Sequence, residues 1–173
     1  ALVPTAVSSP STTASCILSV AEALQPHLAQ GFQIDALRLR LEMERAFGGS
    51  DAAGAWDWKL AYEAGEVALV LTLRKFGRAL LARAGSPAAL LPILAKVSGL
   101  LPTHTRRSEE MERFQQFSTP LPMGLAALAA AQITPRDLVL EPSAGTGLLA
   151  IFAEIAGGSL ALNELADTRA DLL

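Results

Sequence analysis

A glycine-containing turn lies between two short apolar runs that each lead to an acidic residue, and few folds accommodate this order. The first run, residues 138–140, leads to Glu141, and the second, residues 160–162, leads to Glu164. Gly145 and Gly147 fall in the turn, and a helix-like stretch follows them. This order predicts a strand, a glycine turn, a helix and a second parallel strand beside the first.

The two acids favour one class of ligand for such a turn. Glycines at positions i and i+2 let the backbone approach a ligand without Cβ atoms in the way. Glu141, at the end of the first strand, would repel the pyrophosphate of NAD or FAD, whereas it would attract the ammonium and sulfonium groups of S-adenosylmethionine. Glu164 could accept hydrogen bonds from both ribose hydroxyls; its alternative role is that of a surface acid capping the next helix. No Lys-Ser or Lys-Thr follows Gly147, which excludes a P-loop.

Two sequence motifs carry a family resemblance. Glu141 to Gly147 (Glu-Pro-Ser-Ala-Gly-Thr-Gly) resembles the first motif of class I S-adenosylmethionine-dependent methyltransferases. Gln116 to Pro120 (Gln-Phe-Ser-Thr-Pro) resembles the motif that precedes it in adenine-specific DNA methyltransferases. The order of the motifs is similar to that of DNA amino-methyltransferases whose recognition domain comes last. A helical N-terminal domain before this motif is also similar to type I restriction–modification subunits, and methylase–helicase fusions are similar as well. The resemblance covers residues 114–173.

The resemblance implies S-adenosyl-L-methionine as cofactor and assigns roles by position. Residues 117–120 would lie against its methionine part, with Thr119 binding the carboxylate and Glu141 the amine, while Glu164 would bind the ribose. Thr119 has a structural alternative as a helix cap, with Pro120 as the first helical residue. The expected cofactor-binding residues are Phe117, Ser118, Thr119, Pro120, Glu141, Pro142, Ser143, Ala144, Gly145, Gly147, Asn163 and Glu164.

The motif that transfers the methyl group in this family is missing. It reads Asn/Asp-Pro-Pro-Phe/Tyr and positions the amine of a flipped base, yet the chain has no Pro-Pro pair. Two parallel strands also cannot form a buried α/β core by themselves. We therefore expect an N-terminal fragment with no catalytic residue of its own, whose full-length protein methylates DNA. Its apolar surfaces would meet the rest of the methyltransferase polypeptide or a second copy. The alternatives are a methyltransferase acting on RNA or protein, and a helical interaction module without a cofactor.

Composition restricts the other classes of function. Hydrophobic residues make up 51% of the sequence, but no apolar stretch approaches the roughly 18–20 residues that cross a bilayer, and the first residues lack the basic segment of a secretory signal. These features predict a cytoplasmic protein that does not enter membranes. Residues 1–113 carry 12 Lys and Arg against 11 Asp and Glu, and residues 114–173 carry 2 against 6. Neither part has the basic surface of a free-standing nucleic-acid binder. The single cysteine, Cys16, excludes an internal disulfide, and isolated His27 and His104 predict no metal site.

The first two thirds of the chain have helical patterning. Apolar spacing, caps and glycine stops predict helices over residues 15–30, 35–47, 57–84 and 86–100, after a flexible lead of residues 1–13. A helix over 122–132 and a truncated one over 165–173 are expected in the second part. The fold class expected is α + α/β: a helical domain (14–113), then the start of a Rossmann-like methyltransferase domain (114–173) with an incomplete parallel sheet. The basic residues Arg74, Lys75, Arg78 and Arg83 fit a solvated helix face better than a nucleic-acid stripe.

Overall fold

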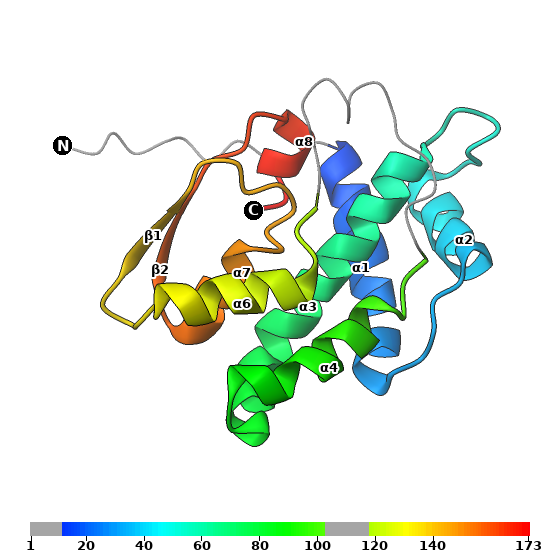
Figure 1. Ribbon diagram of the computed structural model, residues 1–173. Coiled ribbons are helices and arrows are strands. Elements are labelled where there is room, and N and C mark those ends of the chain that lie inside the picture. The colour runs from blue at the N-terminus through cyan, green and yellow to red at the C-terminus, as the bar shows by residue number, and fades with distance from the viewer. Residues whose placement is uncertain (1–11, 103–117) are drawn as a thin grey trace.

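The computed structural model describes residues 12–102 and 118–173, and this part of the chain forms seven helices and one two-stranded sheet (Figure 1). Residues 12–102 are mostly helical, which confirms the helical N-terminal part expected from the sequence. The elements are α1 (Thr12–Gln30), α2 (Ala36–Phe47), α3 (Trp58–Ala84), α4 (Pro87–Ser98), α6 (Leu121–Ala131), β1 (Leu138–Glu141), α7 (Ala150–Ala156), β2 (Ser159–Leu162) and α8 (Asp167–Ala170).

Helix boundaries follow from side-chain caps and glycine stops. The side chains of Asp35, Asp57 and Ser86 accept hydrogen bonds from backbone N–H groups three residues ahead, and so begin α2, α3 and α4. Gly48 and Gly85 end α2 and α3 in the left-handed conformation, where a Cβ would be strained. The helices predicted over residues 15–30, 35–47, 57–84, 86–100 and 122–132 are confirmed with small shifts at their ends. Thr12 and Thr13, which the sequence assigned to the flexible lead, belong to α1.

The helix α2 resolves an ambiguous pattern in the sequence. Its leucines alternate with charged residues as in a strand, but only Leu39, Glu42 and Met43 are buried. Leu37 and Leu41 are 65% and 50% exposed. Burial therefore follows the i, i+3, i+4 spacing of a helix and not the period of a strand.

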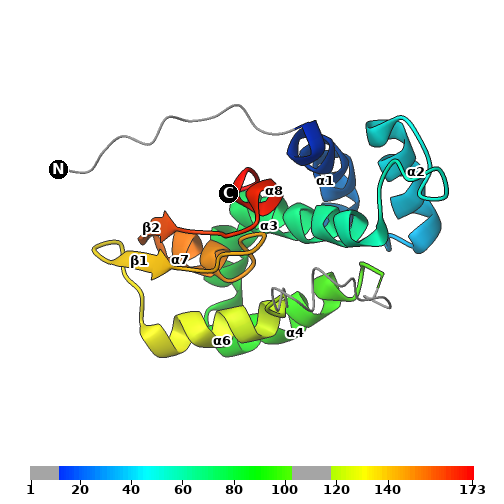
Figure 2. The same ribbon diagram turned by 90° about the horizontal axis from the view of Figure 1, so that it is seen from above.

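The helix α3 is the centre of the molecule. Figure 2 shows α1 on one side of α3, α4 and α6 on the other, α2 near one end and the sheet near the opposite end. One hydrophobic cluster joins these layers, from Ile17 and Leu24 of α1 through Leu73 of α3 to Phe152 of α7. The helical part and the strand–helix–strand unit thus share a single core.

The strand–turn–helix–strand prediction is confirmed. Strands β1 and β2 pair in parallel with Leu138 opposite Ser159 and Glu141 opposite Leu162, and α7 forms the crossover. Leu138 and Leu140 are 72% and 69% exposed, so one face of this two-stranded sheet is bare in the described part of the chain. The helix expected over residues 165–173 is shorter, because only 167–170 are helical. Among the residues described, no helix is long and apolar enough to span a membrane.

Candidate functional site

The glycine turn lies at the edge of the sheet where both parallel strands end. Gly145 and Gly147 have φ values of +59° and +90°, a region that side chains with a Cβ rarely occupy. The backbone N–H of Ala144 donates to the carbonyl of Asn163 at 2.9 Å, which joins the loop after β1 to the loop after β2. The positive φ angles thus explain why glycine is required at both positions of the turn.

The carboxylate of Glu164 faces this turn. Its Oε2 accepts a hydrogen bond from the Gly145 N–H at 2.8 Å, and its Oε1 accepts one from the Ala166 N–H at 3.0 Å. Each carboxylate oxygen keeps a second lone pair that could accept a ligand hydroxyl. Helix α8 begins at Asp167 without a side-chain cap, so the alternative role of Glu164 as a helix cap is wrong.

A cavity of about 210 Å³ lies at the turn and brings the two sequence motifs together. Glu141 reaches it from the end of β1, and Glu141 Oε1 lies 3.4 Å from the Ser143 backbone nitrogen in a long hydrogen bond. The lining residues are Ser118, Thr119, Glu141, Ser143, Ala144, Gly145, Thr146, Leu148, Leu149 and Arg169. The first six of these are among the cofactor-binding residues expected from the sequence.

The other expected residues lie around this cavity or outside the described chain. Phe117 is not among the described residues. Asn163 donates from Nδ2 to the carbonyl of Pro142 at 2.9 Å, so it braces the loop behind the turn. The carbonyl of Gly147 accepts a hydrogen bond from the Ile151 N–H at 2.9 Å, which links the turn to the first residues of α7. Pro120, Pro142, Gly147, Asn163 and Glu164 are not lining residues of this cavity.

The start of α6 differs from the structural alternative for Thr119. The helix begins at Leu121, its cap position is Pro120, and no side chain caps it by a hydrogen bond. Thr119 is therefore not a helix cap. It lines the cavity instead, one residue after Ser118.

Two buried acids of α3 approach this site, and the sequence reasoning missed them. Glu66 is 4% exposed, and its carboxylate accepts hydrogen bonds from the hydroxyls of Ser118 and Thr146, the latter at 2.8 Å. Glu63 is 2% exposed and accepts a hydrogen bond from Arg169 Nε at 2.6 Å. A signal was present in the sequence: two acids three residues apart precede the most apolar part of a long helix, where a solvated face is not expected.

The ion pair between Glu63 and Arg169 is almost fully removed from solvent. The two side chains are 3% and 6% exposed, and Lys59 Nζ lies 3.8 Å from the same Glu63 oxygen. Desolvation raises the pKa of Glu63, and the positive charge and hydrogen bond of Arg169 partly oppose that rise. Arg169 thus lies at the cavity wall in an ion pair with a carboxylate of α3.

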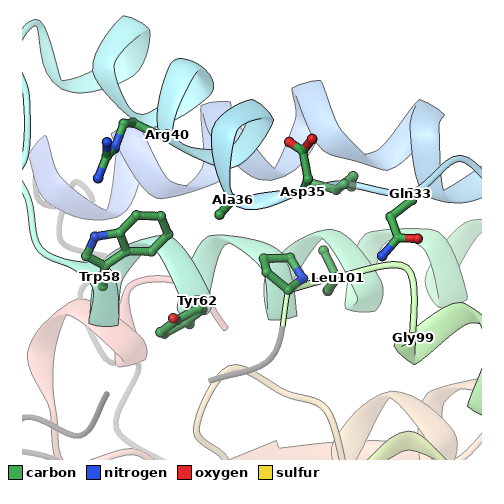
Figure 3. A pocket seen from close by; sticks show the side chains of 10 residues that line it. Gln33, Asp35, Ala36, Arg40, Trp58, Tyr62, Gly99 and Leu101 are labelled. Carbon is green, nitrogen blue, oxygen red and sulfur yellow. The ribbon is translucent and has the colours of Figure 1, made fainter. Parts of the chain in front are cut away.

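Two further cavities lie along α3. One of about 440 Å³ shares Ser118, Thr119 and Leu148 with the cavity at the turn. Another, of about 590 Å³, lies between α2, α3 and the end of α4 (Figure 3). There the Arg40 guanidinium lies 5.5 Å from the centre of the Trp58 ring, and Asp51 Oδ2 accepts hydrogen bonds from both side chains at 3.1 Å. Because Asp51 pairs with Arg40, the guanidinium of Arg40 adds no unbalanced positive charge to this cavity.

No family model, curated protein or solved structure matches this chain. In the described ranges, no three His, Cys, Asp or Glu side chains are grouped so that they could hold a metal ion. The residues of the site converge from the Thr-Pro segment, the glycine turn and α3.

Proposed function

We propose that this chain is the S-adenosylmethionine-binding part of a DNA adenine amino-methyltransferase. The observation that carries the proposal is the cavity at the glycine turn. It gathers Ser118 and Thr119 from one motif with Glu141 and Gly145 from the other, although the two motifs are separated by α6 and β1.

The charges around the turn favour a cationic ligand. Glu141 lines the cavity, and Glu164 faces the turn from the loop after β2. The one cation among the lining residues, Arg169, is held in a buried ion pair with Glu63. A pyrophosphate would meet carboxylates here, whereas ammonium and sulfonium groups would be attracted to them.

The size of the cavity suits only one end of the cofactor. Its volume of about 210 Å³ is below the roughly 300–1,000 Å³ of typical ligand pockets, so the described residues would enclose only part of the molecule. The methionine part would lie in the cavity, with its amine at Glu141 and its carboxylate at Thr119. The adenosine would lie over the turn, with its ribose hydroxyls at Glu164.

The rest of the proposed enzyme would complete the sheet. Parallel sheets are normally covered on both faces, whereas Leu138 and Leu140 of β1 are exposed. We propose that these leucines pack against further elements of a Rossmann-like methyltransferase domain, which would supply the catalytic groups and most of the DNA contacts. A second copy of the chain is the other way to cover this face.

Calorimetric titration of the chain with S-adenosylmethionine tests the proposal. Because hydrogen bonds to charged groups contribute about 1.5–3 kcal/mol, Glu141→Ala and Glu164→Ala should each weaken binding by about tenfold or more. Glu22→Ala is the matched control, since it removes an exposed acid of α1. Unchanged affinity in both site variants contradicts the proposal, and a chain that binds no cofactor would favour the helical interaction module.

A further inference from the structure

We infer that Glu66 is a positioning residue through which the helical part of the chain shapes the methionine end of the cofactor site. The inference rests on the proposed function. The side chain comes from the middle of α3, outside both sequence motifs, and is 4% exposed. It would fix the relative placement of two segments that the cofactor must contact at once.

The geometry makes Glu66 a clamp between these segments. Its Oε1 accepts from the Ser118 hydroxyl, and its Oε2 accepts from the Thr146 hydroxyl at 2.8 Å. Ser118 precedes α6, Thr146 lies in the glycine turn, and both residues line the cavity of about 210 Å³. One carboxylate thus holds the two walls of the cavity together.

The clamp also determines whether the hydroxyls of the cavity wall can donate or accept hydrogen bonds from a ligand. Both hydroxyls act as donors to the Glu66 carboxylate oxygens, so each uses its single proton on Glu66. The lone pairs of Ser118 and Thr146 are then left as acceptors. An acceptor wall suits the ammonium group of the methionine moiety.

This mechanism predicts an effect confined to one end of the ligand. The cofactor S-adenosylmethionine has the amino-acid moiety, whereas 5′-methylthioadenosine has the same nucleoside without it. If Glu66 positions the methionine end, its loss should weaken binding of the first ligand much more than of the second. A merely structural role would weaken both ligands in proportion.

The experiment measures the affinity of the full chain and of five variants for both ligands. We expect Glu66→Ala and Thr146→Val to lower S-adenosylmethionine affinity by about tenfold, the loss of a charge-assisted hydrogen bond. Their affinity for 5′-methylthioadenosine should stay within about twofold of the unmodified chain. Combining the two changes should add little to the larger single effect, because both break the same contact.

Two further variants keep the test informative if Glu66→Ala unfolds. Glu66→Gln retains one acceptor and one donor group and should recover part of the lost affinity. Thr72→Val makes the same change as Thr146→Val, but the Thr72 hydroxyl donates to the Ala68 carbonyl within α3, so this variant should leave both affinities unchanged.

The outcomes separate this inference from the proposed function. If the unmodified chain binds no S-adenosylmethionine, both are wrong. If it binds the cofactor, and folded Glu66→Gln and Thr146→Val variants bind both ligands as it does, only the role of Glu66 is overturned. Equal losses for the two ligands would also overturn it.

Discussion

At the level of single residues, the ion pair between Arg169 and Glu63 makes stability depend on pH. Replacing Arg169 by Met leaves a buried carboxylate without the partner whose Nε lies 2.6 Å away. Removing one member of a buried pair typically costs about 3–5 kcal/mol, so we expect a loss of that order at neutral pH. Chemical denaturation of both proteins at about pH 7.5 measures it.

The sign of the pH effect follows from the raised pKa of Glu63. A carboxyl whose pKa is higher in the folded state is best tolerated when protonated, so its burial costs least below the ordinary value of 4.5 and most above the raised value. The cost of Arg169→Met should therefore shrink as pH falls toward 4.5, and Glu63→Gln combined with it should restore stability at neutral pH. An equal cost at both pH values would contradict this account.

Asp137 in the turn before β1 shows the opposite behaviour. Its Oδ2 accepts hydrogen bonds from the Thr134 N–H at 2.7 Å and the Thr134 hydroxyl at 2.8 Å, which lower the pKa of Asp137 from 3.8. Its contribution to stability is present above 3.8 and is lost as pH falls through the lowered value. We expect Asp137→Asn to lower the urea midpoint at neutral pH and to match the unmodified chain in strong acid. A difference that persists in strong acid would contradict this explanation.

The sequence reveals only some of the site at this scale. Gly145, Gly147, Glu141 and Glu164 could be predicted because a left-handed turn requires glycine and because strand ends place acids at a fixed edge. Glu66 could not, since its partner Thr146 is 80 residues away. Such a contact depends on how α3 packs against the glycine turn, and no local spacing encodes that packing.

At the level of elements, two glycines set how closely α7 packs on its neighbours. A Cβ at Gly124 of α6 would lie 2.6 Å from the Phe152 ring, and one at Gly77 of α3 would lie 2.4 Å from Ile155 Cδ1. Alanine normally stabilises a helix by about 1 kcal/mol relative to glycine. At Gly124 we expect the reverse, a loss of about 1–3 kcal/mol from overpacking, because Phe152 is 1% exposed and its ring has no room to move.

The contrast among glycines tests this packing account. Gly77→Ala should cost less than Gly124→Ala, because half-buried Ile155, whose Cδ1 and Cγ1 would lie 2.4 and 2.9 Å from the new Cβ, can change rotamer. Gly65→Ala is the matched control on α3, with its Cβ at 3.4 Å from Leu101, and should be neutral or stabilising. Thermal unfolding of the three variants ranks them, and a stabilised Gly124→Ala would show that α7 does not pack as described.

Periodicity predicted the elements better than their contacts. The spacing of apolar residues and the caps at Asp35, Asp57 and Ser86 located the first helices, since these signals are local. The segment 165–173 was expected to be helical throughout but is helical only over 167–170. In this segment Arg169 pairs with Glu63 of α3, a tertiary contact that helix propensity cannot predict.

At the level of the whole molecule, one hydrophobic core is shared by the two parts that the sequence predicted to be separate domains. Their boundary near residue 113 falls outside the described residues. The hydrophobic cluster nonetheless runs from α1 through α3 to α7, and the ion pair of Arg169 with Glu63 adds a polar link between the two parts. We therefore expect both parts to unfold in one cooperative transition.

Ligand binding makes this cooperativity measurable. Trp56 and Trp58, whose rings are 5.6 Å apart, are the only tryptophans of the chain and lie at the start of α3. The helix α7 packs near Gly77, toward the other end of α3. At a concentration of 100 times its Kd, S-adenosylmethionine should add about 2.7 kcal/mol to the free energy of unfolding. Because one core joins the parts, the tryptophan fluorescence transition should shift by this amount, although the cofactor would bind at the glycine turn.

Two independent domains would instead leave the tryptophan transition in place while the circular dichroism signal became biphasic. Glu164→Ala, expected to weaken the proposed binding by tenfold or more, should cut the shift to about 1.4 kcal/mol or less at the same cofactor concentration.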